Sequence, residues 1–365
     1  SSADMSLASN KIYTLVVVLA IYWAATFISL KGLGWVSKVA KIGGLIGTII
    51  PAALLVLLAI VYLVSGGESQ MDFGGDFFPD ITKLDNLVLA SGIFLFYAGM
   101  EMTGIHVKDM ENPSKNYPKA VFMGAIITVL IFVLGTFSLG IIIPQNDINL
   151  TQSLLVGFDN YFKFVGMSWL SPIIAIALAF GVLAGVLTWV SGPSKGIFAV
   201  GKAGYLPPFM QRSNKLGVQK NILLIQGGVV TLLSLLFVVM PSVQSFYQIL
   251  SQLTVLLYLI MYLLMFAAAI YLRYNMKDAP RPFRLGKKGN CVMWIVAGVG
   301  FLGSLLAFVL SFIPPAQISV GSNTVWYAVL IIGCVVVVGA PFLIYAMRKP
   351  NWVDKNSQFE PFHFE

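Results

Sequence analysis

The sequence predicts an all-α integral membrane protein, and three observations lead to this prediction. The 365 residues are 58% hydrophobic and only 10% charged, and the mean hydropathy is +0.86. A water-soluble domain of this length does not require so apolar a composition. The apolar residues also form long continuous runs, whereas a membrane barrel shows alternating segments of about ten residues. Helices are therefore expected throughout.

Nine runs reach the length of about 18 residues that a helix needs to cross the hydrocarbon core. The segments between these runs are short and carry no apolar periodicity of their own. The sequence therefore predicts one transmembrane domain over residues 1–347 and a polar tail at 348–365. The nine expected spans cover residues 11–30, 43–65, 86–106, 120–143, 169–193, 221–241, 246–272, 291–313 and 325–346.

The net charge of +8 is explained by membrane topology better than by nucleic acid binding. Five loops, at 31–42, 107–119, 195–220, 273–290 and after 346, hold 20 of the 23 Lys and Arg residues. The positive-inside rule assigns these loops to the cytoplasm. The acidic segment 66–85 then lies outside, and the C-terminus lies inside.

This orientation places Ser1 outside and Glu365 inside, with nine spans between them. The chain starts with neither an initiating Met nor a signal peptide. An odd number of preceding spans would give an ordinary cytoplasmic N-terminus, and three would give twelve spans in total. The alternative is a native nine-span protein with a short translocated N-terminal tail.

The third span contains Glu101, which alone among the fifteen acidic residues lies well inside a long apolar run. A carboxylate at membrane depth is costly and usually faces a polar cavity or a partner on a transport path. Gly99 lies beside it, which is typical of a helix break whose freed N–H and C=O groups face a ligand or water. The alternative is that Glu101 only braces the broken helix.

Two further spans carry patterns at helical spacing. The fifth has a stripe of small residues, Gly181, Gly185, Thr188 and Gly192, for which helix packing is the simpler interpretation. The seventh places Ser251, Thr254, Tyr258 and Tyr262 on one face, which we expect to point away from lipid. These tyrosines either line a pathway or serve as hydrogen-bonding packing residues.

The known signatures of enzymes and cofactor sites are missing from the sequence. The pattern at 298–303 matches the dinucleotide-binding motif by letter, but it lies inside an apolar helix without a preceding strand. Cys291 and Cys334 have neither the spacing of a metal site nor that of a disulfide framework. No cofactor, metal or nucleic acid partner is expected, and the protein is not expected to be an enzyme.

Several segments taken together resemble the amino acid, polyamine and organocation transporter superfamily, and within it the bacterial glutamate/GABA antiporter group. Residues 96–101, followed by 106–107 and 110–120, look like the broken sixth helix of that family and the cytoplasmic segment after it. Residues 144–150 resemble the loop after the seventh helix, and 181–185 with 189–196 resemble the eighth helix. Residues 254–258 with Tyr262 resemble the tenth helix, and 281–284 resemble the loop after it. The resemblance runs from about residue 11 to 347 and begins at the fourth helix of the family.

This resemblance implies a LeuT-like inverted-repeat fold with about nine of twelve helices present. It implies a substrate site lined by Tyr97, Ala98, Gly99, Glu101 and Thr103 and bordered by Tyr258 and Tyr262. Glu101 would act near the inner gate. In the acid-resistance antiporter with which we compare the chain, a glutamate stands where this chain has Gly185. The substrate pair therefore does not follow from the resemblance alone.

The expected function is secondary amino-acid transport, most simply antiport of the glutamate/GABA exchanger type by alternating access, in a bacterial inner membrane. The alternatives are proton- or sodium-coupled uptake on the same fold, and, less favoured, a channel or a membrane-embedded enzyme. The expected partners are amino-acid substrates and the lipid bilayer, with protons as an alternative coupling ion. His363 in the tail has an ordinary pKa near 6.5 and is a candidate pH sensor, in a segment that faintly resembles a cytoplasmic plug.

Overall fold

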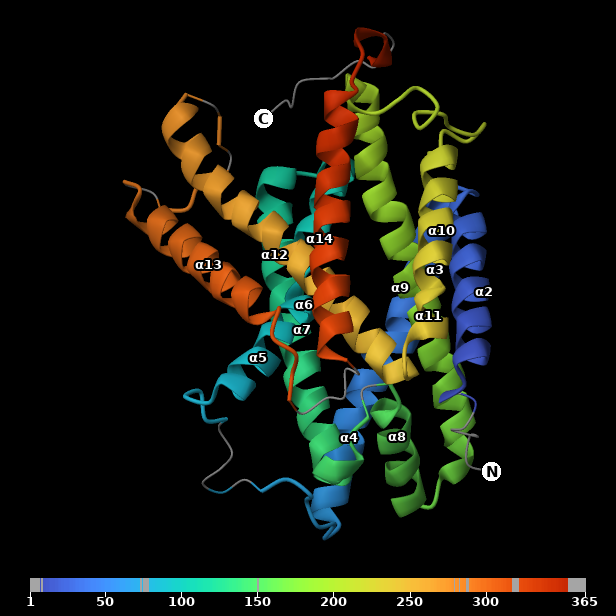
Figure 1. Ribbon diagram of the computed structural model, residues 1–365. Coiled ribbons are helices and arrows are strands. Elements are labelled where there is room, and N and C mark those ends of the chain that lie inside the picture. Colours follow the sequence, from blue (N-terminus) through green and yellow to red (C-terminus); the bar gives the residue numbers. More distant parts are fainter. Residues whose placement is uncertain are drawn as a thin grey trace. The chain divides into compact units, whose positions relative to one another are not determined.

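The computed structural model describes residues 7, 9–72, 74, 79–149, 151–278, 280–281, 283–286, 289–316 and 322–353. These residues form helices and loops (Figure 1). The principal helices are α2 (Lys11–Ser29), α3 (Leu33–Gly44), α4 (Ile50–Val64), α5 (Leu84–Gly92), α6 (Phe94–Tyr97), α7 (Pro113–Ile142), α8 (Ser153–Phe164), α9 (Ser171–Val200), α10 (Lys220–Ser234), α11 (Leu236–Val239), α12 (Val243–Asn275), α13 (Cys291–Leu310) and α14 (Asn323–Ala346).

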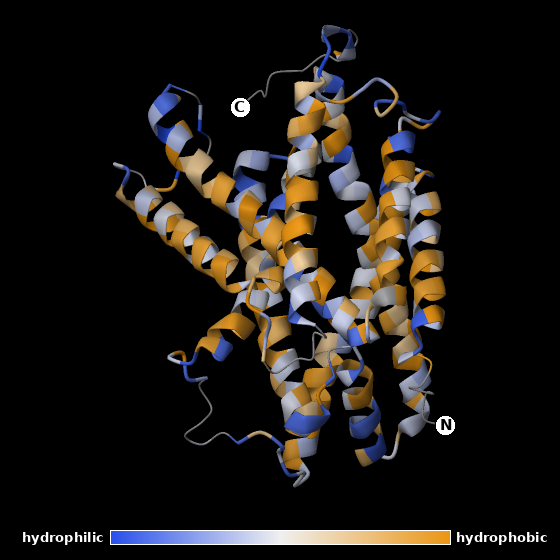
Figure 2. Ribbon diagram, viewed as in Figure 1, coloured by the Kyte–Doolittle hydropathy of each residue, from blue (hydrophilic) through white to orange (hydrophobic). Residues whose placement is uncertain are grey.

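The all-helical class and the nine expected spans are confirmed. Within the described ranges, nine helical segments are long and apolar enough to cross a membrane. Figure 2 shows apolar residues along the middle of the helices and polar residues mainly at their ends and in the loops. Several helices extend beyond the predicted limits. α3, for example, lies largely in the predicted loop 31–42, because the helix begins before the apolar run 43–65 does.

The chain divides into two compact units, which we describe separately. Unit 1 comprises Ser1–Phe78, Ile127–Gln244 and Met347–Ser357. Unit 2 comprises Pro79–Ile126, Ser245–Ala346 and Gln358–Glu365. α7 passes from unit 2 into unit 1, and α12 begins in unit 1 and continues through unit 2.

Unit 1 is organised around α9, which packs against α2, α3, α8 and α10. The tightest approach joins α9 to the π-helical turn η1 (Leu45–Ile49): a Cβ built on Gly181 would lie 2.5 Å from the carbonyl oxygen of Gly47. Only glycine at both positions permits this backbone contact, because a methyl group would overlap the facing main chain. The packing interpretation of the small-residue stripe is therefore confirmed at Gly181.

Unit 1 also contains α8, a short helix that the sequence did not predict. Its twelve residues are too few to span a membrane, and it lies in the expected external loop. Phe158, Tyr161 and Phe162 are 1% exposed and pack on α4 and on the end of α7. The Tyr161 hydroxyl donates to the Ser138 carbonyl at 2.5 Å.

Unit 2 holds α5, α6, α13, α14 and most of α12. Its core includes Val255 and Leu259 of α12 and Ala307 of α13, each at most 3% exposed. Trp326 near the start of α14 is fully buried and donates from Nε1 to the Phe312 carbonyl at 2.8 Å. This core positions the middle of α12, where the candidate site residues lie.

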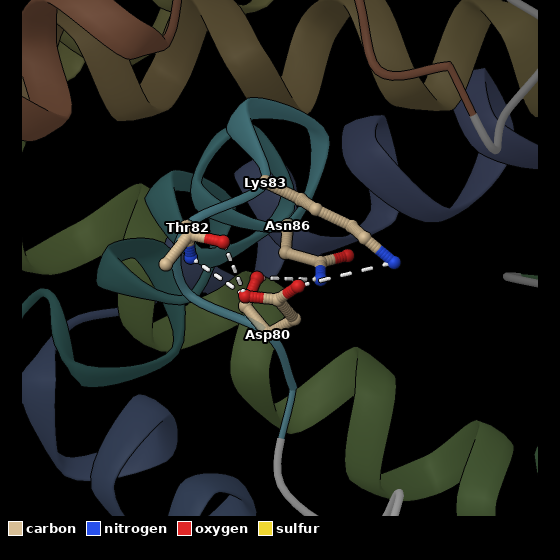
Figure 3. Close-up of polar contacts among 4 residues, drawn as sticks. All are labelled: Asp80, Thr82, Lys83 and Asn86. Carbon is tan, nitrogen blue, oxygen red and sulfur yellow. Dashed lines mark hydrogen bonds and ion pairs between the residues drawn. The ribbon is translucent and has the colours of Figure 1, made fainter.

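α5 begins at a turn that Asp80 organises (Figure 3). Asp80 Oδ1 accepts hydrogen bonds from the Thr82 backbone N–H at 3.0 Å and from its hydroxyl at 2.6 Å. Asn86 Nδ2 donates to the Asp80 carbonyl at 2.9 Å. These bonds from Thr82 lower the pKa of the Asp80 carboxyl. The turn fixes the entry to α5, the helix that leads to the break in the third span.

Candidate functional site

The third span breaks at Ala98 and Gly99. α6 ends at Tyr97, Ala98 is extended with φ −71° and ψ 148°, and Gly99 is left-handed with φ 100° and ψ −4°. A 3₁₀ segment, η2 (Met100–Asp109), follows. Glycine adopts a positive φ without the steric penalty that a Cβ imposes, which explains why the chain turns there. The break predicted beside Glu101 is present, and a left-handed glycine produces it.

The carboxylate of Glu101 folds back onto this break. Its Oε2 accepts a hydrogen bond from the Gly99 backbone N–H at 3.2 Å. Its other oxygen, Oε1, is buried and has no hydrogen-bond partner among the described residues. A buried carboxylate oxygen without a partner is costly and is a ready acceptor for a cationic donor.

Glu101 also joins the break to α12. The Tyr262 hydroxyl donates a hydrogen bond to Glu101 Oε2 at 3.0 Å. Tyr258 lies one turn earlier on α12, and the centroids of the two rings are 5.9 Å apart with an interplanar angle of 53°. Gly99, Glu101, Tyr258 and Tyr262 therefore form one connected group within unit 2.

Thr103 contacts Tyr117, a residue for which the sequence predicts no role. The Thr103 hydroxyl donates to the Met100 carbonyl at 2.7 Å and contacts the Tyr117 hydroxyl at 3.3 Å. A Cβ built on Gly104 would lie 3.2 Å from the same hydroxyl. Tyr117 stands four residues into α7, in the segment 110–120. Its position in that segment was the only sequence signal for it.

Not all of the polar face expected on α12 joins the site. Thr254 is exposed, and its hydroxyl bonds the Leu250 carbonyl of its own helix at 2.8 Å. The buried stripe of this helix instead includes Gln252, Val255 and Leu259. Intrahelical bonding satisfies a threonine hydroxyl without any partner helix, which explains the difference.

The remaining sequence predictions concern other parts of the chain. A Cβ built on Gly185 meets nothing within 4 Å, so the backbone there leaves room for a side chain. His363 lies outside the described residues. The described residues contain no group of three or more His, Cys, Asp or Glu side chains that could hold a metal ion.

Comparison with known proteins relates this chain to membrane transporters. A family model described as amino acid permease matches residues 1–337. An uncharacterized transporter of Legionella pneumophila is 33% identical over 337 residues, which is 92% of this chain and 72% of the relative. A glutamate/gamma-aminobutyrate antiporter of Lactococcus lactis is 33% identical over 371 residues, or 99% of this chain and 72% of the relative.

A more distant relative is an aspartate/glutamate permease of Lactococcus lactis, which is 25% identical over 89% of this chain and 67% of its own length. The match to the family model and the two relatives at 33% identity agree with the nine apolar helices. The resemblance noted in the sequence is thereby confirmed. This multi-pass membrane protein belongs to the amino acid permease family of transporters.

Proposed function

We propose that this transporter is an antiporter of the glutamate/GABA exchanger type, which works by alternating access. The observation that carries the proposal is the state of Glu101: one oxygen is shared by the Gly99 N–H and the Tyr262 hydroxyl, and the other is buried and unpaired. The substrate's amino group would donate to this unpaired oxygen, because an ammonium supplies the charge and the protons that it lacks.

The substrate site comprises the residues around the break and the two tyrosines of α12. Tyr97, Ala98, Gly99, Glu101 and Thr103 line one side, and Tyr258 and Tyr262 border the path. Glu101 also acts as the gate, because its bond to Tyr262 joins the broken segment to α12. A substrate that competes with Tyr262 for the Glu101 carboxylate would weaken this bond. Substrate binding would thereby be coupled to movement of the broken segment relative to α12.

The exchanger type is supported by the name of the Lactococcus lactis antiporter, which is 33% identical over 99% of this chain. The location is a bacterial cell membrane. The C-terminus lies in the cytoplasm, because it follows the last span on the same side as the loops that hold most Lys and Arg residues, and such loops are cytoplasmic. Residues 1–347 would form the transporter domain, and 348–365 would form a cytoplasmic tail.

Counterflow in proteoliposomes tests this proposal. The full-length native protein is reconstituted, labelled glutamate is placed outside, and a panel of amino acids is placed inside, at acid and at neutral pH. Accumulation of label only with particular internal amino acids, GABA above all, is the expected result.

The same experiment separates the exchanger from coupled uptake, the alternative that the aspartate/glutamate permease favours. If no internal amino acid drives uptake but a proton or sodium gradient does, the exchange mechanism is wrong and coupled uptake replaces it. Passive flux of label without either driving force would instead indicate a channel.

A further inference from the structure

A cavity with a mixed polar and apolar lining is present in unit 1. Its volume is about 280 Å³, and it is bounded by the end of α2, by α3, by the last turns of α9, by the start of α10 and by the loop that precedes α10. None of its lining residues belongs to the group around Glu101. We call it the α2–α9 cavity.

The rim of the α2–α9 cavity is a folded loop. Asn214 Nδ2 donates to the Leu30 carbonyl at the end of α2 at 2.7 Å. Asn214 Oδ1 accepts from the N–H groups of Leu216 and Val218 at 2.9 and 3.1 Å. Gly217 has a φ of +75°, which completes the turn. The hydrogen bonds of one asparagine therefore tie this wall of the cavity to α2.

The polar part of the lining includes a hydroxyl without a partner. Ser29 is 3% exposed, and its Oγ makes no hydrogen bond to any residue that the structure describes. Gln219 is 7% exposed and donates from Nε2 to the Ser194 hydroxyl at 2.9 Å. Lys195 adds a positive charge to the lining. Because the Ser29 hydroxyl lines the cavity and has no partner among the described residues, it is available to donate to an occupant.

The charge around this cavity is of one sign. Residues 11–67 and 160–277, which supply all of its walls, contain no Asp or Glu. Among the lining residues, Lys195 is the charged side chain. A cavity with a lysine in its lining and no carboxylate in its walls favours an anion.

The depth and the apolar lining indicate what kind of anion fits. Ser29 is the last residue of α2. Lys195 lies about 36 Å along α9 from its first residue, Ser171, a distance greater than the thickness of the hydrocarbon core, which is about 30 Å. Both residues are therefore at the level of phospholipid headgroups. Phe198, Leu216 and Leu223 give the rest of the lining an apolar character that a free inorganic ion cannot use.

We propose that the α2–α9 cavity binds a phosphate group, namely the phosphodiester of an anionic phospholipid headgroup. Lys195 neutralises the phosphate, and Ser29 donates a hydrogen bond to it. The lipid's apolar part covers the neighbouring hydrophobic lining. Bound lipid would hold α2, α9 and the loop before α10 together on the side rich in lysine.

The experiment uses the full-length native protein after detergent removal of lipid. Phosphatidylglycerol, phosphatidylcholine with the same acyl chains, and inorganic phosphate are titrated separately. Native mass spectrometry measures bound lipid, and thermal unfolding measures stabilisation. Phosphatidylglycerol should bind and raise the unfolding temperature more than phosphatidylcholine does.

Two variants and one matched control complete the design. Lys195→Gln should weaken phosphatidylglycerol binding by about tenfold, the scale of one lost charge-assisted hydrogen bond. Ser29→Ala should also weaken it without lowering the unfolding temperature of lipid-free protein, because its hydroxyl has no protein partner to lose. Lys38→Gln removes an exposed lysine of α3 outside the lining and should bind like the wild type.

Each result decides the proposal. Stabilisation by inorganic phosphate that is lost in both variants would keep the phosphate chemistry and replace the lipid by the free anion. Unchanged phosphatidylglycerol binding in both Lys195→Gln and Ser29→Ala would overturn the site. An equal loss in Lys38→Gln would also overturn it, since it would show general attraction to a basic surface. None of these results depends on which amino acids the protein exchanges.

Discussion

Tyr262 donates a hydrogen bond to Glu101, 161 positions earlier in the chain, at 3.0 Å. This bond joins the middle of α12 to a segment whose helix is broken two residues before Glu101. The same carboxylate oxygen accepts from the Gly99 N–H, so helix break and tyrosine share one acceptor. A change in the charge of Glu101 would alter both bonds together.

Glu101→Gln tests the role of the charge. Glutamine keeps an oxygen that accepts from Tyr262 but carries no negative charge, so transport should be abolished or its pH dependence altered. Counterflow rates measured across a pH series check this outcome. Asp85→Asn, at the exposed start of α5 in the same unit, is the control and should retain the wild-type profile. Wild-type rates and pH profile in Glu101→Gln would remove Glu101 from the mechanism.

Tyr262→Phe tests the connection to α12. The variant keeps the ring beside Tyr258 and loses only the hydroxyl that bonds Glu101. A hydrogen bond to a charged group contributes about 1.5–3 kcal/mol, so exchange should slow by about tenfold or more. Initial exchange rates give the measurement. Tyr271→Phe removes an exposed hydroxyl from the same helix and should leave the rate unchanged. Equal rates for both variants would show that this bond carries no part of the cycle.

Gly99→Ala tests the left-handed residue at the break. A Cβ at a φ of 100° costs about 1–2 kcal/mol, so the variant should be less stable and should transport poorly. Gly92→Ala is the matched control. Gly92 lies in α5, and its new Cβ would be 4.0 Å from the Gln252 side chain, so helix propensity should make it neutral or stabilising. Thermal unfolding and counterflow of both variants separate backbone strain from a general effect of an added methyl group.

Gly181→Ala and Gly185→Ala test the packing of α9 with the same chemical change four residues apart. The first methyl group meets the Gly47 backbone at 2.5 Å, whereas the second meets nothing within 4 Å. Gly181→Ala should therefore lower the unfolding temperature or abolish folding, and Gly185→Ala should not. A fluorescence-detected thermal stability assay in detergent measures both. Comparable stability of the two variants would contradict the close contact.

The ion pair of Asp159 and Lys163 should contribute to the stability of the fold in a way that depends on pH. Its carboxylate lies 2.6 Å from Lys163 Nζ and accepts from the Ser171 hydroxyl at 2.9 Å, and the hydrogen bond from Lys163 is the main cause of its lowered pKa. A pKa that is lower in the folded state stabilises the fold above the unfolded value of about 3.9 and less as pH falls through the folded pKa.

Asp159→Asn should therefore destabilise the protein slightly at pH 7, by up to about 1 kcal/mol because the pair is partly exposed. The difference from the wild type should shrink as pH falls below about 4. Unfolding measured at both pH values checks this. A difference that does not depend on pH would indicate that the amide disturbs packing instead.

The sequence alone predicts the helical class, the nine spans and the break at Glu101, because long apolar runs and an isolated carboxylate are local signals. The partners of Glu101 were not local. The helical spacing of Tyr258 and Tyr262 predicts that they either line a pathway or pack by hydrogen bonding, and the family resemblance places them at the substrate path. No rule of spacing links them to a residue about 160 positions away. The structure places these residues together; their role in binding stays a prediction.

The misses have physical causes as well. α8 buries Phe158, Tyr161 and Phe162 with an apolar face too short to register as a span. Most of α3 lies in the predicted loop 31–42, because an apolar run predicts the part of a helix inside the hydrocarbon and not where the helix begins. Lysine side chains reach the polar boundary from a helix that continues, so the charge marks the depth but not the helix end.

The contact between Gly47 and Gly181 constrains how unit 1 can move. Two backbones in van der Waals contact have no side chains between them that could change rotamer and absorb sliding. We therefore expect α9 and the turn η1 to move together as one rigid body during the transport cycle. Flexibility in unit 1 would then arise where α9 and η1 contact other elements. A bulky residue at either glycine would separate α9 from η1 and let the two move independently.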